Sequence, residues 1–246
     1  LWYAVCFETR TEIQPYMNMP KINKQIIPAT VLLAFALLLT GCDKIVPTYV
    51  FDLTRLAADG SEYKGNGRYL EQSWPCVRDN KTGFMWEVKT ATPGLHAGTN
   101  TYTWYNPDEK TNGKSEGETN AMVEGKPNGG VCTGSACDTE AFVAAVNAER
   151  LCGYSDWRLP GKEELGSLVD ATVRMPGPTL PKDFFPNTQN SKFGYWTATI
   201  FRMHHGSAWA WRFDQGADFV AVKDEPRYGK LVRGTAKAAE NQKLVQ

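Results

Sequence analysis

Hydrophobic positions follow a helical spacing in the stretch that leads to the middle of the chain. Phe142 and Val146 stand four residues apart, so they would lie on one face of a helix. Asp138 or Thr139 is placed to cap the start of this helix, and Gly153 stands just past its last turn. The pattern therefore predicts a helix that begins at residue 138 or 139 and ends before Gly153.

A second helical pattern follows Pro160, a residue that the first turn of a helix tolerates because the N–H there needs no partner. Glu163 and Glu164 fall in this first turn, where acidic side chains interact well with the helix dipole. Leu165 and Leu168 then recur three residues apart. We expect a second helix that opens at Pro160, with a rigid corner between the two helices.

Elsewhere, apolar and polar residues alternate in short runs that predict strands. In one of them Phe84, Trp86 and Val88 form an apolar face and leave Glu87 on the polar one. The expected strands cover residues 48–56, 77–79, 84–88, 195–200, 208–213, 219–222 and 230–233. Two helices followed by a set of short antiparallel strands predict an α+β domain.

Two segments show no regular pattern, residues 89–137 and 175–190. The first is rich in Gly, Asn, Thr, Lys and Glu, so we expect a long exposed loop. The second contains four prolines, which keep it out of helices and strands. Long loops of this kind are usual places for ligand contacts.

Three residues are candidates for binding a ligand: Trp104, Tyr105 and Arg212. Trp104 either tethers the first loop to the core or, with Tyr105, forms an aromatic platform for a sugar or a peptide. If Trp209 and Trp211 face the core, Arg212 points outward near this loop, where a guanidinium suits a sugar or an anionic group.

Several motifs follow one another in an order that carries a family resemblance. They are Cys76 to Glu87, Gly153 to Pro160 with the acidic residues that follow, Tyr195 to Thr197, and Val232 to Gly234. Together they resemble the DUF1566 family, also called the C-terminal domain of the Legionella collagen-like adhesin, over about residues 50–234. The resemblance implies a C-type lectin-like fold, with two helices packed on short antiparallel sheets and long loops, and a role in binding at a bacterial surface.

The residues that carry this signature have a structural interpretation as well. The signature positions are Trp157, Arg158, Pro160, Glu164, Trp196 and Arg233. We expect Trp157 to pack between the two helices, because tryptophan is mostly buried. We expect Arg158 to bind backbone carbonyls or a carboxylate such as Asp156 or Asp170.

The beginning of the chain resembles a bacterial export signal. A short basic segment precedes an uncharged stretch, residues 25–41, which ends in Leu39-Thr40-Gly41-Cys42, a match to a lipobox. The alternative is an ordinary signal peptide or an anchor helix. We therefore expect residues 1–16 to be an upstream extension, residues 17–41 a lipoprotein signal peptide, Cys42 the lipidated residue, and residues 42–49 a linker.

The two ends of the mature chain add two further expectations. Asp43, directly after the lipidated cysteine, resembles the signal that retains lipoproteins at the inner membrane, so we expect the protein at its periplasmic face. Residues 235–246 are polar and Ala-rich and are predicted to be a flexible tail. The domain itself would occupy residues 50–234.

Four further cysteines are consistent with an oxidising compartment. They are Cys76, Cys132, Cys137 and Cys152, and three pairings are possible. Cys132 and Cys137 close a small loop easily, which favours that pair together with Cys76–Cys152. A metal site with His204 and His205 is the alternative, but adjacent histidines point apart and seldom bind one ion together.

Charge and motifs exclude several classes of function. The chain has 27 basic and 27 acidic residues, and removal of residues 1–41 takes away three basic and two acidic ones, leaving a net charge near −1. Such a charge does not attract nucleic acid. The chain has no Walker or His-Glu-x-x-His motif. Arg158-Leu159-Pro160 is also similar to a segment of formylglycine-generating enzymes, but those need cysteines late in the domain and none follows Cys152.

These observations leave two hypotheses and a weaker third. The first is a lipid-anchored envelope module that binds carbohydrate or another surface ligand, with no cofactor, no metal and no enzymatic activity. The second is a structural or protein-binding envelope lipoprotein. The third is an enzyme related to the formylglycine-generating fold. The chain lacks a collagen-like Gly-X-Y repeat and the calcium motifs of C-type lectins, so neither property of those proteins is expected here.

Overall fold

The computed structural model describes residues 51–235, apart from residues 119–121, 124–125, 128–129 and 192. The expected signal peptide, Cys42, the linker and residues 236–246 of the tail lie outside the described residues. The described part is a mixed, sheet-rich α+β domain with two α-helices. Within it, no helix is long and apolar enough to cross a membrane.

The first sheet has four antiparallel strands in the order β1-β2-β3-β11. Its strands are β1 (Leu53–Leu56), β2 (Cys76–Asp79), β3 (Met85–Glu87) and β11 (Val232–Arg233). The predicted turn joins β2 to β3. There the Asp79 carboxylate accepts a hydrogen bond from Lys81 N at 2.9 Å, and Gly83 adopts a φ of 82° that favours glycine.

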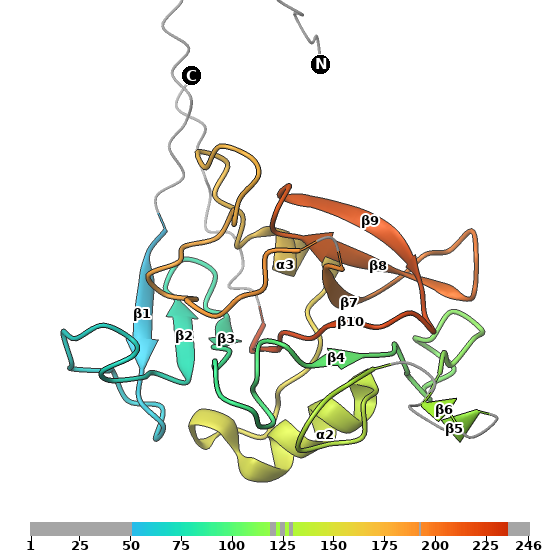
Figure 1. The fold of residues 1–246 in the computed structure, drawn as a ribbon, viewed down its shortest axis with the longest axis horizontal. Helices are drawn as coiled ribbons and strands as arrows, with labels where there is room; N and C mark the ends of the chain where they lie inside the picture. Colours follow the sequence, from blue (N-terminus) through green and yellow to red (C-terminus); the bar gives the residue numbers. More distant parts are fainter. Residues whose placement is uncertain (1–50, 119–121, 124–125, 128–129, 192, 236–246) are drawn as a thin grey trace, which may run out of the picture. The chain divides into compact units, whose positions relative to one another are not determined.

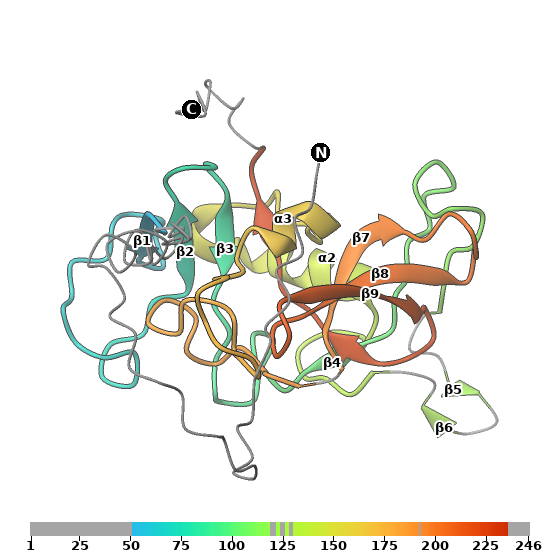
Figure 2. The same cartoon turned by 90° about the horizontal axis from the view of Figure 1, so that it is seen from above.

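The second sheet has five strands in the order β4-β10-β7-β8-β9. They are β4 (Thr101–Tyr102), β10 (Arg227–Tyr228), β7 (Tyr195–Ile200), β8 (Ser207–Arg212) and β9 (Ala217–Val222). All neighbours are antiparallel except β10 and β7, so the expectation of purely antiparallel sheets is wrong at this pair. Figure 1 and Figure 2 show β1, β2 and β3 in one sheet and β7, β8 and β9 in the other. A small hairpin, β5 (Met122–Val123) with β6 (Lys126–Pro127), completes the strands described.

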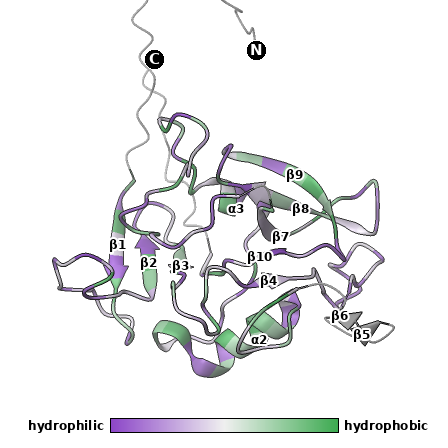
Figure 3. Ribbon diagram, viewed as in Figure 1, coloured by the Kyte–Doolittle hydropathy of each residue, from purple (hydrophilic) through white to green (hydrophobic). Residues whose placement is uncertain are grey.

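Helix α2 (Thr139–Glu149) begins where the sequence predicts. The Asp138 carboxylate accepts a hydrogen bond from Ala141 N at 2.8 Å and so caps the first turn. The helix ends four residues before Gly153, because Arg150 and Cys152 take left-handed φ values of 56° and 51°. A 3-10 turn, η1 (Leu151–Gly153), fills the remaining positions. Hydrophobic and hydrophilic residues both occur along α2 (Figure 3), and its buried residues include Phe142 and Val146.

Helix α3 (Lys162–Gly166) is shorter than the spacing predicts, and it starts after Pro160 rather than at it. Gly161 is the N-cap, and its N–H donates to the Glu164 carboxylate at 2.7 Å. A Cβ at Gly166 would stand 2.8 Å from the Trp211 ring, so this end of the helix lies directly against β8. Leu168 is buried beyond the helix, in the turn that follows it.

Strand β8 buries the opposite face from the one that two tryptophans would suggest. Ala208 and Ala210 are fully buried, whereas Trp209 and Trp211 are half-buried. The small alanines leave room for Trp104 and Trp196, which pack with them in one hydrophobic cluster. The sequence predicted that Arg212 points outward if Trp209 and Trp211 face the core. Because both tryptophans are only half-buried, that condition is not met.

The segment 89–137 is not the exposed loop that its composition suggests. It contributes strand β4 to the second sheet, and many of its described residues are buried. Lys89, Asn100 and Asn112 are each at most 4% exposed. Residues 175–190, by contrast, contain no helix or strand, as predicted, and Phe185 anchors them in the core.

Candidate functional site

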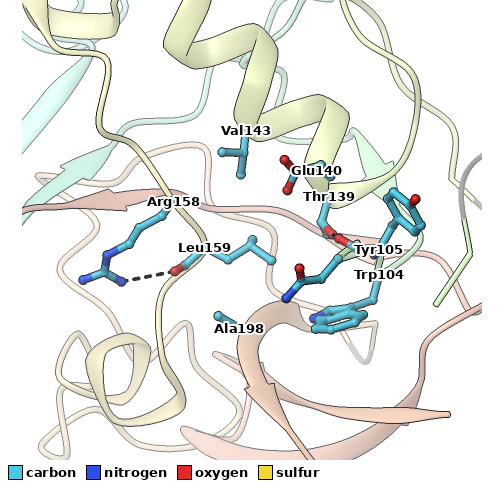
Figure 4. A pocket seen from close by; sticks show the side chains of 9 residues that line it. Trp104, Tyr105, Thr139, Glu140, Val143, Arg158, Leu159 and Ala198 are labelled. Carbon is cyan, nitrogen blue, oxygen red and sulfur yellow. Dashed lines mark hydrogen bonds between the residues drawn. The ribbon is translucent and has the colours of Figure 1, made fainter. Parts of the chain in front are cut away.

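A cleft of about 230 Å³ lies between the start of α2, the segment after β4 and the middle of β7 (Figure 4). Its lining combines aromatic, aliphatic and polar side chains, which is typical of small-ligand sites. The lining residues are Trp104, Tyr105, Asn106, Thr139, Glu140, Val143, Arg158, Leu159 and Ala198. Two of the three predicted ligand-binding residues, Trp104 and Tyr105, therefore come together here.

Hydrogen bonds to the Thr139 side chain and between backbone groups fix the segment after β4 to the start of α2. Tyr105 N donates to Thr139 Oγ1, and the Thr139 hydroxyl donates to Tyr105 O, both at 2.9 Å. Thr103 N also donates to the Cys137 carbonyl at 3.0 Å. Because α2 and this segment share these bonds, the two walls of the cleft form a rigid pair.

Trp104 is a tether of the core, with a side chain only 1% exposed, and not an open platform. Its indole N–H donates to the Thr197 carbonyl at 2.9 Å. The Lys223 ammonium lies 4.1 Å from the centre of the ring, a cation–π contact. The first of the two interpretations of Trp104, a plug that holds the segment to the core, is thus the one that its burial supports.

Lys223 holds the next part of the segment in place. Its ammonium donates to the carbonyls of Asn112 at 2.9 Å and Ser115 at 2.6 Å. Burial lowers the pKa of Lys223 to about 8. A buried cation with carbonyl partners and an aromatic neighbour is a structural element, and it explains why a polar stretch is well packed here.

Tyr105 is half-buried, and its ring lies at the edge of the cleft (Figure 4). Partial burial, together with the negative charges of Glu116 and Asp138, raises the pKa of Tyr105. The phenol is therefore neutral at physiological pH. It offers a ligand an aromatic face and one hydroxyl group.

Arg158 lines the cleft, but its guanidinium is directed toward other partners. It makes a bidentate pair with Glu164, at 2.7 and 2.8 Å, and donates to the carbonyls of Leu159 and Gly234 at 3.2 and 3.0 Å. The prediction of backbone carbonyls or a carboxylate as partners is confirmed, but the carboxylate is Glu164, because Asp156 binds Arg233 and Asp170 binds Thr172. Burial opposes ionisation of Glu164, but Arg158 and the Gly161 N–H outweigh it and lower its pKa.

Trp157 is buried, at 2% exposure, under α2. Its indole N–H donates to the Leu151 carbonyl at 3.0 Å, and its backbone exchanges two hydrogen bonds with the Asn147 side chain. It shares a hydrophobic cluster with α2, whereas the buried leucine of α3, Leu165, belongs to another cluster. Packing between the two helices is therefore not what the structure shows.

The remaining signature residues are structural as well. Pro160 is buried, and its carbonyl accepts a hydrogen bond from Ala198 N at 2.8 Å. Trp196 is fully buried and donates to the Tyr102 carbonyl at 2.7 Å. The Pro160 bond links the corner after α2 to β7, whereas the Trp196 bond joins β7 to β4 within the second sheet.

Arg212 does not belong to the cleft. Its guanidinium pairs with Asp214, at 3.0 and 2.6 Å, two residues further along the chain. The prediction that Arg212 lies near Trp104 and Tyr105 as a ligand contact is wrong, because this local ion pair occupies the guanidinium at the end of β8.

Both disulfides form in the favoured pairing. Cys76 bonds to Cys152 with a Cα–Cα distance of 6.6 Å, and Cys132 bonds to Cys137 with a distance of 5.5 Å. The first ties β2 to the turn after α2. Among the residues that the structure describes, no cluster of three or more metal-binding side chains occurs, and His205 is exposed.

The sequence did not reveal a buried charge cluster around Glu87. This carboxylate is fully buried on β3, where alternation predicted a polar face. It contacts the Lys89 ammonium at 2.9 Å and His96 Nδ1 at 2.7 Å, and its backbone carbonyl accepts from Lys230 at 2.7 Å. His96 Nε2 in turn contacts the Glu149 carboxylate on α2. Lys89 and His96 follow Glu87 closely in the sequence, whereas Lys230 stands 143 positions away, so no local pattern reveals the cluster.

Burial and charge act in opposite directions on this cluster. Burial would raise the pKa of Glu87, but Lys89 and His96 outweigh it and lower the pKa to about 2. Burial would lower the pKa of His96, and the two carboxylates raise it. Burial dominates at Lys230 and lowers its pKa to about 7.

The described residues form a small α+β domain with a partly aromatic cleft. The chain matches the family model of the Lcl C-terminal domain over residues 75–233, and it belongs to this family. The family is adhesin-related and non-enzymatic, which is compatible with a surface-associated binding module. No curated protein and no solved structure matches the chain.

Proposed function

We propose that this chain is a lipid-anchored lipoprotein of the bacterial envelope whose domain, of C-type lectin-like fold, binds a carbohydrate or another surface ligand. The observation that carries the proposal is the cleft beside Tyr105. It joins a half-exposed aromatic ring to apolar walls and polar side chains, and its walls are fixed by the Thr139 hydrogen bonds. Membership of an adhesin-related family supports a binding role.

The proposed lipid anchor is inferred from the sequence near Cys42. Leu39-Thr40-Gly41-Cys42 matches a lipobox, and the two disulfides of the domain are typical of an oxidising compartment outside the inner membrane. Asp43 favours retention at the periplasmic face of the inner membrane. A lipid anchor at this position would leave the domain free to meet envelope glycans.

A glycan array tests the ligand class. The mature protein, solubilised in detergent, is applied to neutral, anionic and amine-bearing glycans, with a heat-unfolded sample as the control. Binding of a defined glycan set by the folded protein supports the proposal. An array that stays blank with folded protein contradicts carbohydrate binding and favours the second candidate.

That second candidate is a protein-binding role, and strand β9 favours it. β9 is the last strand of its sheet (Figure 1), and Val220 and Val222 are 39% and 43% exposed. An open strand edge with apolar side chains can add a strand from another protein. Replacement of Val220 by lysine would abolish such pairing, measured as loss of a crosslinked partner, while leaving glycan binding intact.

A further inference from the structure

We propose that the cleft selects the protonated amine of an amino sugar and excludes sulfated or otherwise anionic glycans. This rests on the proposed function, because it names the ligand class of the same cleft. Three features carry it: an unpaired carboxylate in the lining, a lining arginine without a free charge, and a tyrosine ring in a negative environment.

The unpaired carboxylate is that of Glu140, in the first turn of α2. Its side chain is exposed and lines the cleft (Figure 4), and no ion pair or hydrogen bond to it occurs within the described part of the chain. A first-turn carboxylate also offsets the positive end of the helix dipole. Asp138 caps the same helix end, so the N–H groups there do not form a site for an anion.

The lining arginine cannot supply a site for an anion either. Both terminal nitrogens of Arg158 are engaged, each by one Glu164 oxygen and one backbone carbonyl. The Glu164 carboxylate neutralises the charge at 2.7 Å. The charge that remains uncompensated in the lining is therefore the negative charge of Glu140.

The Tyr105 ring also favours a positively charged ligand over a negatively charged one. Glu116, Asp138 and Glu140 all place negative charge around Tyr105. The face of an aromatic ring attracts a cation and repels an anion. An ammonium group between the Tyr105 ring and the Glu140 carboxylate would receive both interactions.

Size and wall chemistry favour a sugar over a long chain. The cleft of about 230 Å³ is smaller than the roughly 300 to 1,000 Å³ of sites for drug-sized ligands, so it suits one sugar unit at the end of a glycan. Val143, Leu159 and Ala198 provide apolar surface for the C–H groups of a sugar ring. The polar side chain of Asn106 stands at the same opening and can bind a hydroxyl group.

The test compares two ligands with the same sugar backbone, one with charged amines and one in which each amine is acetylated and neutral. The mature protein in detergent is titrated calorimetrically with a glucosamine tetrasaccharide and with its fully N-acetylated form. We expect the amine form to bind at least about tenfold more tightly, through an ion pair with Glu140 and a cation–π contact with Tyr105 together. The preference is expected to shrink in the Glu140→Gln variant and at high salt, and to remain in Glu163→Gln, whose carboxylate lies outside the cleft and is 82% exposed.

Each other outcome has a defined meaning. Equal affinity for the two forms, tighter binding of a sulfated glycan, or an unchanged preference in Glu140→Gln overturns the amine assignment while leaving the proposed glycan binding in place. Binding of a lysine-rich peptide without either tetrasaccharide overturns the assignment to a sugar. The absence of binding to any glycan overturns both the amine assignment and carbohydrate binding. Melting curves of Glu140→Gln and Glu163→Gln distinguish a change in binding from a loss of folding.

Discussion

At the residue scale, the Arg158–Glu164 pair shows how one signature motif serves the fold. The guanidinium joins a carboxylate on α3 to the carbonyl of Gly234, beyond β11, so a single side chain links the corner to the end of the domain. Glu164 also accepts the N–H of Gly161 and thereby starts α3. Charge and geometry both matter in such a pair.

We expect Glu164→Gln to destabilise the domain by about 1 to 2 kcal/mol, because a charge-assisted hydrogen bond becomes neutral and one N–H loses its acceptor. Urea unfolding followed by tryptophan fluorescence measures the change. The neighbouring Glu163→Gln is the matched control, since an exposed carboxylate contributes within about 0.5 kcal/mol. Equal effects of the two substitutions would show that the pair has no special role.

At the scale of elements, the segment between β3 and β4 is joined to α2 by charge. His96 lies between the fully buried Glu87 of β3 and Glu149 in the last turn of α2. The Lys89 ammonium also lies 4.6 Å from the centre of the Phe142 ring on α2. The stability of this connection therefore depends on the protonation of His96.

The raised pKa of His96 determines how the stability of the domain changes with pH. The histidine binds its proton more tightly in the folded state, so its contribution is fully present below the unfolded pKa of 6.5 and is lost as pH rises through the higher folded value. We expect His96→Gln to destabilise the domain most at about pH 5.5 and progressively less toward pH 9. Thermal unfolding of both proteins across this range measures the difference.

The pH dependence of His96 has to be measured as a difference between wild type and His96→Gln, because Lys230 also makes stability depend on pH. Its folded pKa of about 7 lies below the unfolded value of 10.5, so between these values it makes stability rise with pH, opposite to His96. The difference between wild type and His96→Gln removes this contribution, which both proteins share. A difference that stays constant or grows with pH would contradict the role assigned to His96.

At the scale of the whole molecule, the sequence predicted the local features and missed those that distant partners decide. The β2–β3 turn, the Asp138 cap and the disulfide pairing follow from adjacent residues or loop length. Buried Lys89 contacts Phe142, which is more than 50 positions away in the sequence. Buried Asn112 contacts Lys223, which is more than 100 positions away. Composition cannot show such contacts.

The same reasoning applies to the candidate site. Tyr105 and Trp104 were found because aromatic residues in a polar segment are conspicuous, and both line the cleft. Arg212 was assigned to it by strand alternation alone, but the nearby Asp214 binds it locally. Glu140 and Arg158 reach the cleft through the packing of α2 against the corner, which no sequence pattern specifies.

The lipid anchor is a prediction for the whole protein. Cys42→Ala, or treatment with globomycin, should leave an unprocessed precursor that runs more slowly on a gel, because the lipidated cysteine is needed for cleavage of the signal peptide. Two or more acyl chains would hold the wild type in the membrane fraction, where one would not. Unchanged mobility of the variant would contradict the assignment.

The central claim is that the cleft beside Tyr105 is the ligand-binding site, and one comparison tests it most directly. Affinity for the glycan found on the array is measured for wild type, Tyr105→Ala and the control Tyr154→Ala, an exposed tyrosine that does not line the cleft. We predict that Tyr105→Ala weakens binding at least about tenfold, a loss of roughly 1.4 kcal/mol, with a melting temperature near that of wild type. Full binding by Tyr105→Ala, or an equal loss in both variants, would contradict the account.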